Sequence, residues 1–383
     1  MFHTENTVTL LATIAATISA FGALYCLTQD RDKLVFRLLA FFLIASTMAE
    51  LGTVLNPILI SPYAKAIVRS LWIVGAASVT PLFWLYVWTL TAENQQLPKR
   101  LIWHFALPLL YAFAAIIIAI MMIDGAIPIL DEAAVRNQIL SGNYEGLMFP
   151  IPFQWAFYFT LTARRLVQYH ARLKDVFAST EKKEMQWVSF VMASYGVYWI
   201  LQTGSVIFEM VTDRPGVPVV VEYAFNIVIV TTITLWGLRQ RPGIVPHQAE
   251  KSPAPSYEKS ALDEEAKVRI AKKLRRAMQA DKLYLNANLS LWILARHVRV
   301  GDNYVSQVLN EKIGENFFDF VNGYRIRDAQ DRLKDSSETI LTIAYDVGFN
   351  SRSSFYTAFK KVTNMTPTAF RKAQIHSEQI SLS

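Results

Sequence analysis

The stretch IAYDVGFNSRSSFYTAFKKVTNMTPTAFRK, Ile343–Lys372, is the most informative part of this chain of 383 residues. Its pattern predicts a short helix, a tight turn at Gly348 and a second helix that Ser351 caps. Two helices held at a fixed angle by such a turn are a device for placing one helix in a groove of DNA. Long apolar runs precede this segment, so a predicted DNA reader follows a region with the composition of a membrane protein.

A related pattern lies upstream, in LSLWILARHVRVGDNYVSQVLNEK, Leu289–Lys312. It predicts a helix that Ser290 caps, a turn at 299–302 and a second helix at 303–312. Between the two patterns, Phe317–Lys334 predicts one helix of roughly 27 Å. That length is not far below the ~34 Å between successive major-groove faces, so a stiff helix would hold two reading helices about one turn of DNA apart.

Helical periodicity also predicts which side chains face the core of this region. The first helix pair is expected to bury Leu291, Leu294, Ala295, Val298, Val305, Val308 and Leu309. The connecting helix presents Phe318, Val321, Ile326, Ala329 and Leu333 along one side. The second pair is expected to bury Ile340, Ile343, Ala344, Val347, Phe355, Phe359 and Val362.

Three motifs give the region a family resemblance. NEKIGENFFDFVNGYRIRDAQDRL crosses the connecting helix, IAYDVGFNSRSSFYTAFKK covers the second helix pair, and MTPTAFRK closes the domain. With them, Leu289–Lys372 resembles the AraC/XylS DNA-binding domain, which implies two helix-turn-helix units and double-stranded DNA as a partner. Gly301 stands where that family usually has a capping Ser or Thr, so Asp302 is expected to cap instead. Asn364 replaces a common Gly and tolerates the left-handed conformation.

Helix spacing and the motif of that family predict the positions that face DNA bases. They are Asn303, Ser306, Gln307, Arg352, Ser353, Tyr356 and Thr357. Arg suits the guanine edge and Asn or Gln the adenine edge, so Arg352 and Gln307 are the preferred candidates. Phosphate contacts, which position a protein without reading sequence, are expected from Lys360, Lys361 and Arg371. The competing interpretation of each residue is a solvated surface side chain.

The region before Arg239 consists of long apolar runs. Hydrophobic residues make up 52% of the whole chain and charged residues 18%, which is too apolar for an ordinary soluble protein. Runs of about 20 residues cross the hydrocarbon core of a membrane as helices. Seven runs qualify: Val8–Leu27, Leu34–Leu55, Ala66–Leu90, Leu101–Ile123, Ile151–Val167, Trp187–Val211 and Val217–Leu238. The predicted fold is therefore all-α, with a seven-helix transmembrane bundle followed by a tandem helix-turn-helix domain.

The basic residues predict the orientation of these spans. The loops after spans one, three and five, together with the segment after span seven, hold 13 Lys and Arg, and the opposite side holds 4. Because Lys and Arg collect on the cytoplasmic side, the N-terminus is expected outside and the C-terminus in the cytoplasm. We therefore expect a multi-pass protein of the bacterial inner membrane, with membrane lipid around the bundle and the reader on the side that holds DNA.

Composition also sets the expected domain boundaries. Residues 1–239 form the membrane region, and the Pro-rich segment 240–262 is a semi-extended linker. Residues 263–288 are a helical lead-in whose apolar stripe is free to pack on the reader, to pair with a second copy or to lie on lipid. Residues 289–372 are the DNA-binding domain, and 373–383 a flexible tail. A homodimer is thus one candidate assembly.

Polar side chains inside the predicted spans are costly and are often functional. Six residues are candidates for a signal-binding pocket that opens outward: Glu50, Gln154, Trp155, Gln202, Glu222 and Asn226. The competing interpretation is interfacial anchoring together with hydrogen bonds between helices. Neither interpretation identifies a ligand, so the signal stays unknown.

The sequence favours no catalytic or cofactor chemistry. It contains one cysteine, Cys26, and neither a phosphate-cradling Gly loop nor clustered metal ligands. We therefore expect no catalytic residues, no metal and no cofactor. The leading hypothesis is a membrane-embedded transcription regulator that senses a signal and binds promoter DNA. One alternative is a membrane receptor or transporter with a basic cytoplasmic tail, because residues 263–383 hold 19 basic and 14 acidic residues, a net charge of +5. The other alternative is a regulator released from the membrane by proteolysis.

Overall fold

The computed structural model describes residues 2–30, 32–92, 97–123, 150–179, 186–212, 217–239, 262–335 and 338–381. Within these ranges the chain is all-α, as predicted, and its β-structure is one isolated bridge between Phe177 and Ser290. The chain divides into two compact units. The first is Met1–Leu166 with Met185–Val245, and the second is Val167–Glu184 with Pro246–Ser383. The predicted linker at 240–262 lies outside the described residues except for Leu262.

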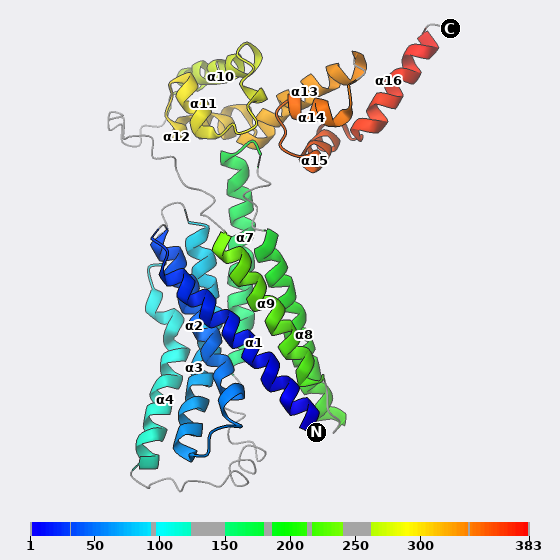
Figure 1. Cartoon of the computed structure of the whole chain (residues 1–383). Helices are drawn as coiled ribbons and strands as arrows, with labels where there is room; N and C mark the ends of the chain where they lie inside the picture. The colour runs from blue at the N-terminus through cyan, green and yellow to red at the C-terminus, as the bar shows by residue number, and fades with distance from the viewer. Residues whose placement is uncertain are drawn as a thin grey trace. The chain divides into compact units, whose positions relative to one another are not determined.

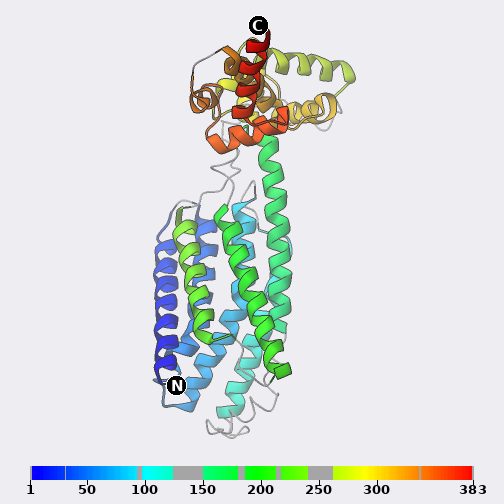
Figure 2. The same ribbon diagram turned by 90° about the vertical axis from the view of Figure 1, so that its right-hand side faces the viewer.

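The first unit is a bundle of long apolar helices (Figures 1 and 2). Its helices are α1 (Phe2–Leu27), α2 (Lys33–Leu55), α3 (Pro62–Leu90), the short η1 (Leu101–Phe105), α4 (Ala106–Ile123), the first part of α7 (Pro150–Val176), α8 (Gln186–Thr212) and α9 (Val219–Arg239). Each predicted span coincides with one of these helices, apart from the fourth, which η1 and α4 share. The fifth predicted span ends at Val167, whereas α7 continues for nine more residues, to Val176.

Length and composition alone qualify four described helices as membrane-spanning. They are Asn6–Leu27, Lys33–Leu55, Tyr63–Leu90 and Val220–Arg239, and they correspond to the first, second, third and seventh predicted spans. Leu101–Ile117 is apolar but shorter. The count of seven spans therefore stays a prediction.

Glycines allow the helices of the bundle to approach closely. A Cβ atom on Gly75 of α3 would lie 2.7 Å from the backbone nitrogen of Ala49 and 2.8 Å from the carbonyl oxygen of Ala45, both in α2. A Cβ on Gly22 of α1 would lie 2.8 Å from a Thr234 side-chain carbon in α9. Helices in lipid associate through such close backbone packing because apolar burial offers little driving force there.

Arg165 lies inside α7, two residues before the end of the fifth predicted span. Its side chain is buried and donates a hydrogen bond of 2.7 Å from Nε to Thr91 Oγ1, at the end of α3. Its guanidinium carbon lies 4.2 Å from the centre of the Trp88 ring. A hydrogen bond and an aromatic face together compensate the charge, so α7 continues through Arg165 without a break.

The second unit is a compact helical domain. Its helices are α10 (Glu264–Gln279), η2 (Leu283–Leu285), α11 (Leu291–Val298), α12 (Asp302–Val308), the π-helical turn η3 (Leu309–Ile313), α13 (Phe317–Asp335), α14 (Ile340–Asp346), α15 (Arg352–Thr363) and α16 (Pro367–Ser381). Residues from 167 to 179, which include the end of α7, belong to the same unit. The predicted flexible tail is helical as far as Ser381, because no Gly or Pro follows Pro367 to stop α16.

Two hydrophobic clusters form the core of the second unit, and α13 contributes to both. Phe317, Phe320 and Val321 pack with α10, α11 and α12, whereas Ile326 and Leu333 pack with α14 and α15. α13 has 19 residues, so it extends for about 28 Å and holds the two helix pairs on one support.

The predicted core faces are largely confirmed. Among the residues predicted to be buried in the two helix pairs, the following are buried: Leu291, Leu294, Ala295, Val298, Val305, Val308, Leu309, Ile343, Ala344, Val347, Phe355 and Phe359. Val362 is 49% exposed, so its prediction is wrong. It occupies the last turn of α15, which ends at Thr363. Phe318 and Ile340 are half-buried, and Phe317 and Phe320 fill the core in place of Phe318.

Capping side chains begin the helices of this unit. The predicted caps at Ser290 and Ser351 accept the backbone N–H groups of Ile293 and Ser354 at 3.4 Å and 3.2 Å. Gly301, not Asp302, is the N-cap of α12, and no side chain caps that helix. Asp302 instead accepts the adjacent N–H of Asn303 at 2.9 Å, because it already lies within the first turn. Asn364 has the left-handed φ of 58° that its substitution for Gly suggested.

The lead-in helix α10 packs on the DNA-binding domain. Its predicted stripe of Ile270, Ala271, Leu274 and Met278 is buried, with Ala277 beside it. These side chains join the cluster of α11, α12 and α13. Of the three alternatives for this stripe, packing within the domain is therefore the one that the structure contains.

Arg325 is the buried polar centre of the second unit. Its side chain is fully buried and donates to the carbonyl oxygens of Tyr284 at 2.8 Å and Asn286 at 2.9 Å. It also donates to the carbonyl oxygen of Ala178 and to Ser179 Oγ, both at 3.3 Å. The residues that follow α7 are thereby part of the same network as α13.

Gly348 lies against this centre and needs the absence of a side chain. Its φ is +95°, and a Cβ there would lie 2.6 Å from the Tyr284 carbonyl oxygen and 3.1 Å from Arg325 Nε. The turn between α14 and α15 therefore depends on glycine both for its backbone conformation and for its space.

We expect Gly348→Ala to destabilise the second unit by more than the left-handed backbone alone explains. Gly314→Ala is the matched control, because Gly314 has φ +81° and nothing within 4 Å of the added Cβ. The control should cost about 1–2 kcal/mol of unfolding free energy, and Gly348→Ala a further ~1–3 kcal/mol. Hydrogen exchange of the α13–α15 amides measures both losses, and equal losses would contradict the close contact.

Candidate DNA interface and bundle pocket

The second reading helix, α15, presents its predicted base-facing residues to solvent. Arg352, Ser353 and Thr357 are exposed, and Tyr356 is half-buried. Arg352 donates from Nη2 to the Tyr356 hydroxyl at 3.4 Å, and its guanidinium carbon lies 5.0 Å from the centre of that ring. The Arg352 side chain is thus supported by its neighbour one turn away and remains available to a base edge.

Tyr356 is itself held in place. Its hydroxyl lies 3.4 Å from Thr368 Oγ1, and that hydrogen bond lowers the pKa of the phenol from its usual value. Thr368 belongs to α16, so the closing helix of the domain orients the residue that supports Arg352.

The first reading helix, α12, has a different environment. Asn303 is exposed, whereas Ser306 and Gln307 are half-buried. Gln307 Nε2 donates to both carboxylate oxygens of Glu311, at 3.2 Å and 3.1 Å. The amide group that would bind adenine is therefore already hydrogen-bonded within the domain.

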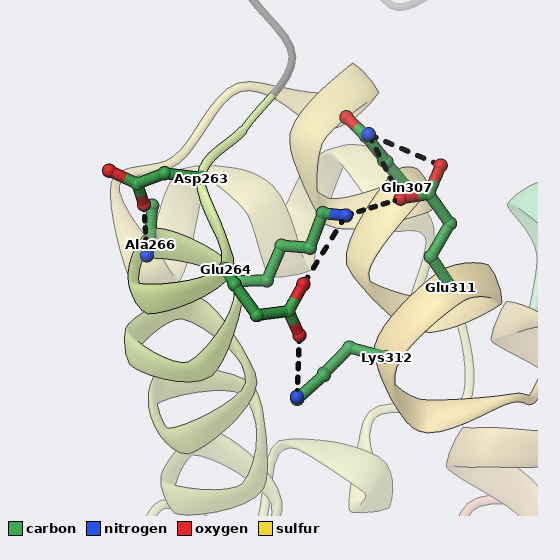
Figure 3. A network of polar contacts seen from close by, with 7 residues as sticks. Asp263, Glu264, Ala266, Gln307, Glu311 and Lys312 are labelled. Carbon is green, nitrogen blue, oxygen red and sulfur yellow. Dashed lines mark hydrogen bonds and ion pairs between the residues drawn. The ribbon is translucent and has the colours of Figure 1, made fainter.

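An ion-pair network holds Glu311 beside Gln307 (Figure 3). Lys267 of α10 lies 2.9 Å from Glu311 and 3.7 Å from Glu264, and Lys312 lies 2.6 Å from Glu264. The hydrogen bond to Lys267 lowers the pKa of Glu311, and the same bond raises the pKa of Lys267. The network joins α10 to the end of α12 and restrains Gln307 in its present position.

The three predicted phosphate contacts differ in their availability. Lys360 is exposed. Lys361 lies 2.7 Å from Asp319 of α13 in an ion pair. Nε and Nη2 of Arg371 are buried and have no hydrogen-bond partner in the described part of the chain, so Arg371 presents only part of its guanidinium to solvent. Lys360 is therefore the best placed of the three for a phosphate.

A cavity of about 310 Å³ lies within the first unit, lined by residues of α2, α3, α7, α8 and α9. Glu50, Trp155, Glu222 and Asn226 line it, so it brings together four of the six residues predicted for a signal pocket. Asn226 donates from Nδ2 to Glu50 Oε1. Glu50 is buried, and its other oxygen, Oε2, has no hydrogen-bond partner among the residues that the structure describes.

Of the two other predicted pocket residues, Gln154 is not among the described residues that line this cavity. Gln154 donates from Nε2 to the carbonyl oxygen of Ala77 at 3.0 Å, in a hydrogen bond between α7 and α3. Gln202 belongs to α8, and its side chain lies outside the described residues. Gln154 therefore fits the competing interpretation, in which polar residues bond helices to one another.

Several lining residues were not predicted. They are Ser46, Ala49, Trp72, Ala76, Val79, Tyr195, Tyr198, Tyr223 and Ile229. The spacing of Glu222 and Asn226 by four residues places both on one helix face, and Tyr195 and Tyr198 share a face in the same way. Aromatic residues at helical spacing would have identified this wall of the pocket.

Comparison with known proteins identifies the C-terminal region. Residues 294–373 match the family of helix-turn-helix domains called HTH_18. This region is an AraC-type helix-turn-helix domain of the kind found in transcription regulators. An HTH-type transcriptional regulator of Staphylococcus aureus (strain COL) is 36% identical over 90 residues, which cover 24% of this chain and 12% of that protein. The melibiose operon regulatory protein of Escherichia coli K12 is 32% identical over 79 residues, 21% of this chain and 26% of that protein.

Two solved structures are similar to this chain, and each covers 27% of it. The C-terminal domain of AraT, a response regulator from Geobacillus stearothermophilus, is 28% identical, covers 27% of this chain and 88% of that chain, and has a TM-score of 0.26. A protein from Listeria innocua is 27% identical, covers 27% of this chain and 96% of that chain, and has a TM-score of 0.25. The curated relatives are matched over at most about a quarter of their length, so their similarity concerns the DNA-binding domain alone.

We expect Arg352→Ala to remove sequence preference at one base position of the bound DNA. The loss should be roughly 1–3 kcal/mol at that position, because the bidentate contact of an Arg to guanine is lost. Lys360→Ala, in the same helix, is the comparison: it should weaken binding to all sequences alike and reduce the salt dependence of the affinity. Footprinting with the full chain in detergent measures both, and an unchanged preference for Arg352→Ala would overturn the assignment.

Proposed function

We propose that this chain is a membrane-embedded transcription regulator. In this proposal the bundle senses a signal, and the AraC-type domain binds promoter DNA in a sequence-specific manner. Net charge and the exposed face of α15 support DNA as the partner, because base contacts require a polar, accessible helix face and phosphates require positive charge.

The membrane assignment rests on the apolar helices and on the distribution of basic residues. Four described helices have the length and composition of spans, and Lys and Arg are concentrated in the loops on the side of the C-terminus. The proposal therefore places the protein in the bacterial inner membrane with its DNA-binding domain in the cytoplasm.

The observation that carries the proposal is that one helix contributes to both units. α7 supplies Trp155 to the bundle pocket, and the residues directly after it supply Phe177–Ser179 to the DNA-binding unit. Trp155 and Val176 belong to the same helix, α7. A rotation or displacement of α7 thus offers the signal a route that does not pass through the linker 240–262.

The segment after α7 is bound firmly within its unit. The Ala178 N–H donates to the Leu289 carbonyl oxygen at 3.2 Å, and its own carbonyl accepts from Arg325 and Asn322 at 3.3 Å each. The Phe177 ring packs on Trp292 of α11 with centroids 5.5 Å apart. These contacts reach the N-terminal side of the first helix-turn-helix unit, which holds α12.

These contacts also bear on the alternatives. Proteolytic release in the linker would separate the DNA-binding domain from Phe177–Ser179 and leave Arg325 and Asn322 without the Ala178 carbonyl oxygen. Because a buried donor without a partner costs free energy, we rank release below direct coupling. A receptor or transporter with a basic tail does not account for the match of residues 294–373 to helix-turn-helix domains.

Promoter binding by the intact chain tests the proposal. The full-length protein, incorporated in lipid vesicles, should protect a defined DNA site, and that protection should survive an excess of competitor DNA. Binding that is salt-sensitive but shows no sequence preference would instead support the receptor or transporter alternative.

Coupling through α7 predicts that the rotational phase of this helix controls transcription. Two alanines inserted after Gln168, an exposed position, rotate the following residues by about 200°, whereas seven rotate them by ~20° less than two full turns. We expect the two-residue insertion to change the basal output of a promoter reporter about 5-fold or more. The seven-residue insertion should restore the original output.

Promoter occupancy is the control for these insertions, since both variants should still bind DNA. Wild-type output from the two-residue insertion would mean that α7 does not carry the signal. Loss of occupancy in both variants would mean that the insertions disrupt the domain itself.

A further inference from the structure

We propose that the bundle pocket binds a small organic cation, an amine or a quaternary ammonium with an apolar body. This inference rests on the proposed function, which it deepens by giving the signal a chemical class. Three features of the pocket support it: a buried carboxylate with a free oxygen, an aromatic wall and a lining without positive charge.

Glu50 provides the carboxylate. Its side chain is only 6% exposed. Oε1 accepts from Asn226, whereas Oε2 is buried and has no hydrogen-bond partner in the described part of the bundle. A buried carboxylate needs a cation or donors for both oxygens to offset the loss of its hydration. A cationic group in the cavity would provide what Oε2 lacks.

The charge of the lining selects the sign of the ligand. Glu222 is a second carboxylate, and Lys and Arg are absent from the described lining residues. Because the described lining carries negative groups and no positive one, it disfavours an anion and favours a cation by Coulomb attraction, which is strong where water is excluded.

The aromatic residues select an organic cation over a metal ion. Trp72, Trp155, Tyr195, Tyr198 and Tyr223 all line the cavity. The Trp155 ring lies 5.3 Å from that of Tyr195, edge to face, and 6.0 Å from that of Tyr198. Aromatic faces around a carboxylate bind ammonium groups through cation–π attraction and apolar contact. No group of three or more His, Cys, Asp or Glu that could hold a metal occurs in the described part of the chain.

A neighbouring cavity shows what this arrangement adds. It has about 300 Å³, shares Trp155 and Tyr195 with the first, and is lined otherwise mostly by apolar residues such as Phe83 and Met192. The described residues that line this neighbouring cavity include no Asp or Glu. The two cavities are similar in size, so the presence of Glu50 and Glu222 is what makes the first one suited to a cation.

Ligand binding to the full chain in lipid nanodiscs tests the inference. The probes are choline and its uncharged isostere 3,3-dimethylbutan-1-ol, and 2-phenylethylamine and its uncharged counterpart 2-phenylethanol. Tryptophan fluorescence reports binding, because Trp72 and Trp155 line the cavity. We expect at least one cation to bind, and its uncharged counterpart to bind at least tenfold more weakly.

Glu50→Gln should weaken cation binding at least tenfold, since it removes the charge and keeps the size of the side chain and a hydrogen bond to Asn226. Asp30→Asn removes one negative charge at a position that is 92% exposed and outside the lining, and should leave binding unchanged. Tyr198→Leu should weaken cation binding several-fold and provides a second variant if Glu50→Gln does not fold. Thermal unfolding verifies the fold of each variant.

The inference is overturned if no cation binds, if the uncharged counterparts bind equally well, or if Glu50→Gln binds cations as the unchanged protein does. These outcomes are distinct from a failure of the proposed function. Loss of sequence-specific promoter binding would contradict the transcription regulator and leave the measured ligand class intact. Promoter binding without cation binding would contradict only the pocket assignment.

Discussion

The buried guanidinium of Arg325 is the interaction on which the DNA-binding unit depends. A guanidinium has five N–H donors and no acceptor, so burying it requires several oxygens at fixed positions. Here those oxygens belong to backbone segments that are far apart in sequence: Tyr284 and Asn286 after α10, and Ala178 after α7. Arg325 itself lies midway along α13, and the ring of Phe349 lies 5.4 Å from its guanidinium carbon. One side chain therefore ties together both helix-turn-helix units and the segment that leaves the bundle.

The two reading helices are prepared for DNA in different ways. α15 offers Arg352 supported by Tyr356, with the side chain exposed. α12 offers Gln307 already hydrogen-bonded to Glu311, which Lys267 holds in turn. A base contact by Gln307, which the sequence predicts, would require its amide group to leave Glu311, which Lys267 of α10 holds. The second helix-turn-helix unit therefore already presents Arg352 to solvent. In the first helix-turn-helix unit, Gln307 has to exchange its hydrogen-bond partner before its amide group is available.

Sequence reasoning succeeded where the determining contacts are local. Helical periodicity identified the buried faces of α11, α12 and α14, and the caps at Ser290 and Ser351 follow from side chains three residues from their partners. Glu50, Glu222 and Asn226, which the sequence predicts together for a pocket, line one cavity. Contacts between residues that are far apart in the sequence could not be predicted. The Lys361–Asp319 pair joins residues 42 positions apart. The contact of Ala178 with Arg325 joins residues 147 positions apart, and no local pattern contains either.

The division of the chain into interleaved units has a consequence for its biosynthesis. Residues 167–184 leave the ribosome before α8, α9 and the linker, yet their partners in the DNA-binding unit lie beyond residue 246. At about 5–20 residues per second, the segment waits roughly 5–30 seconds for Tyr284, Asn322 and Arg325 to be made. During that interval Phe177 and Ala178 have neither Trp292 nor Arg325 to contact. The DNA-binding domain is thus completed only after α9 has been made, so a chain arrested before that point carries no assembled DNA-binding domain.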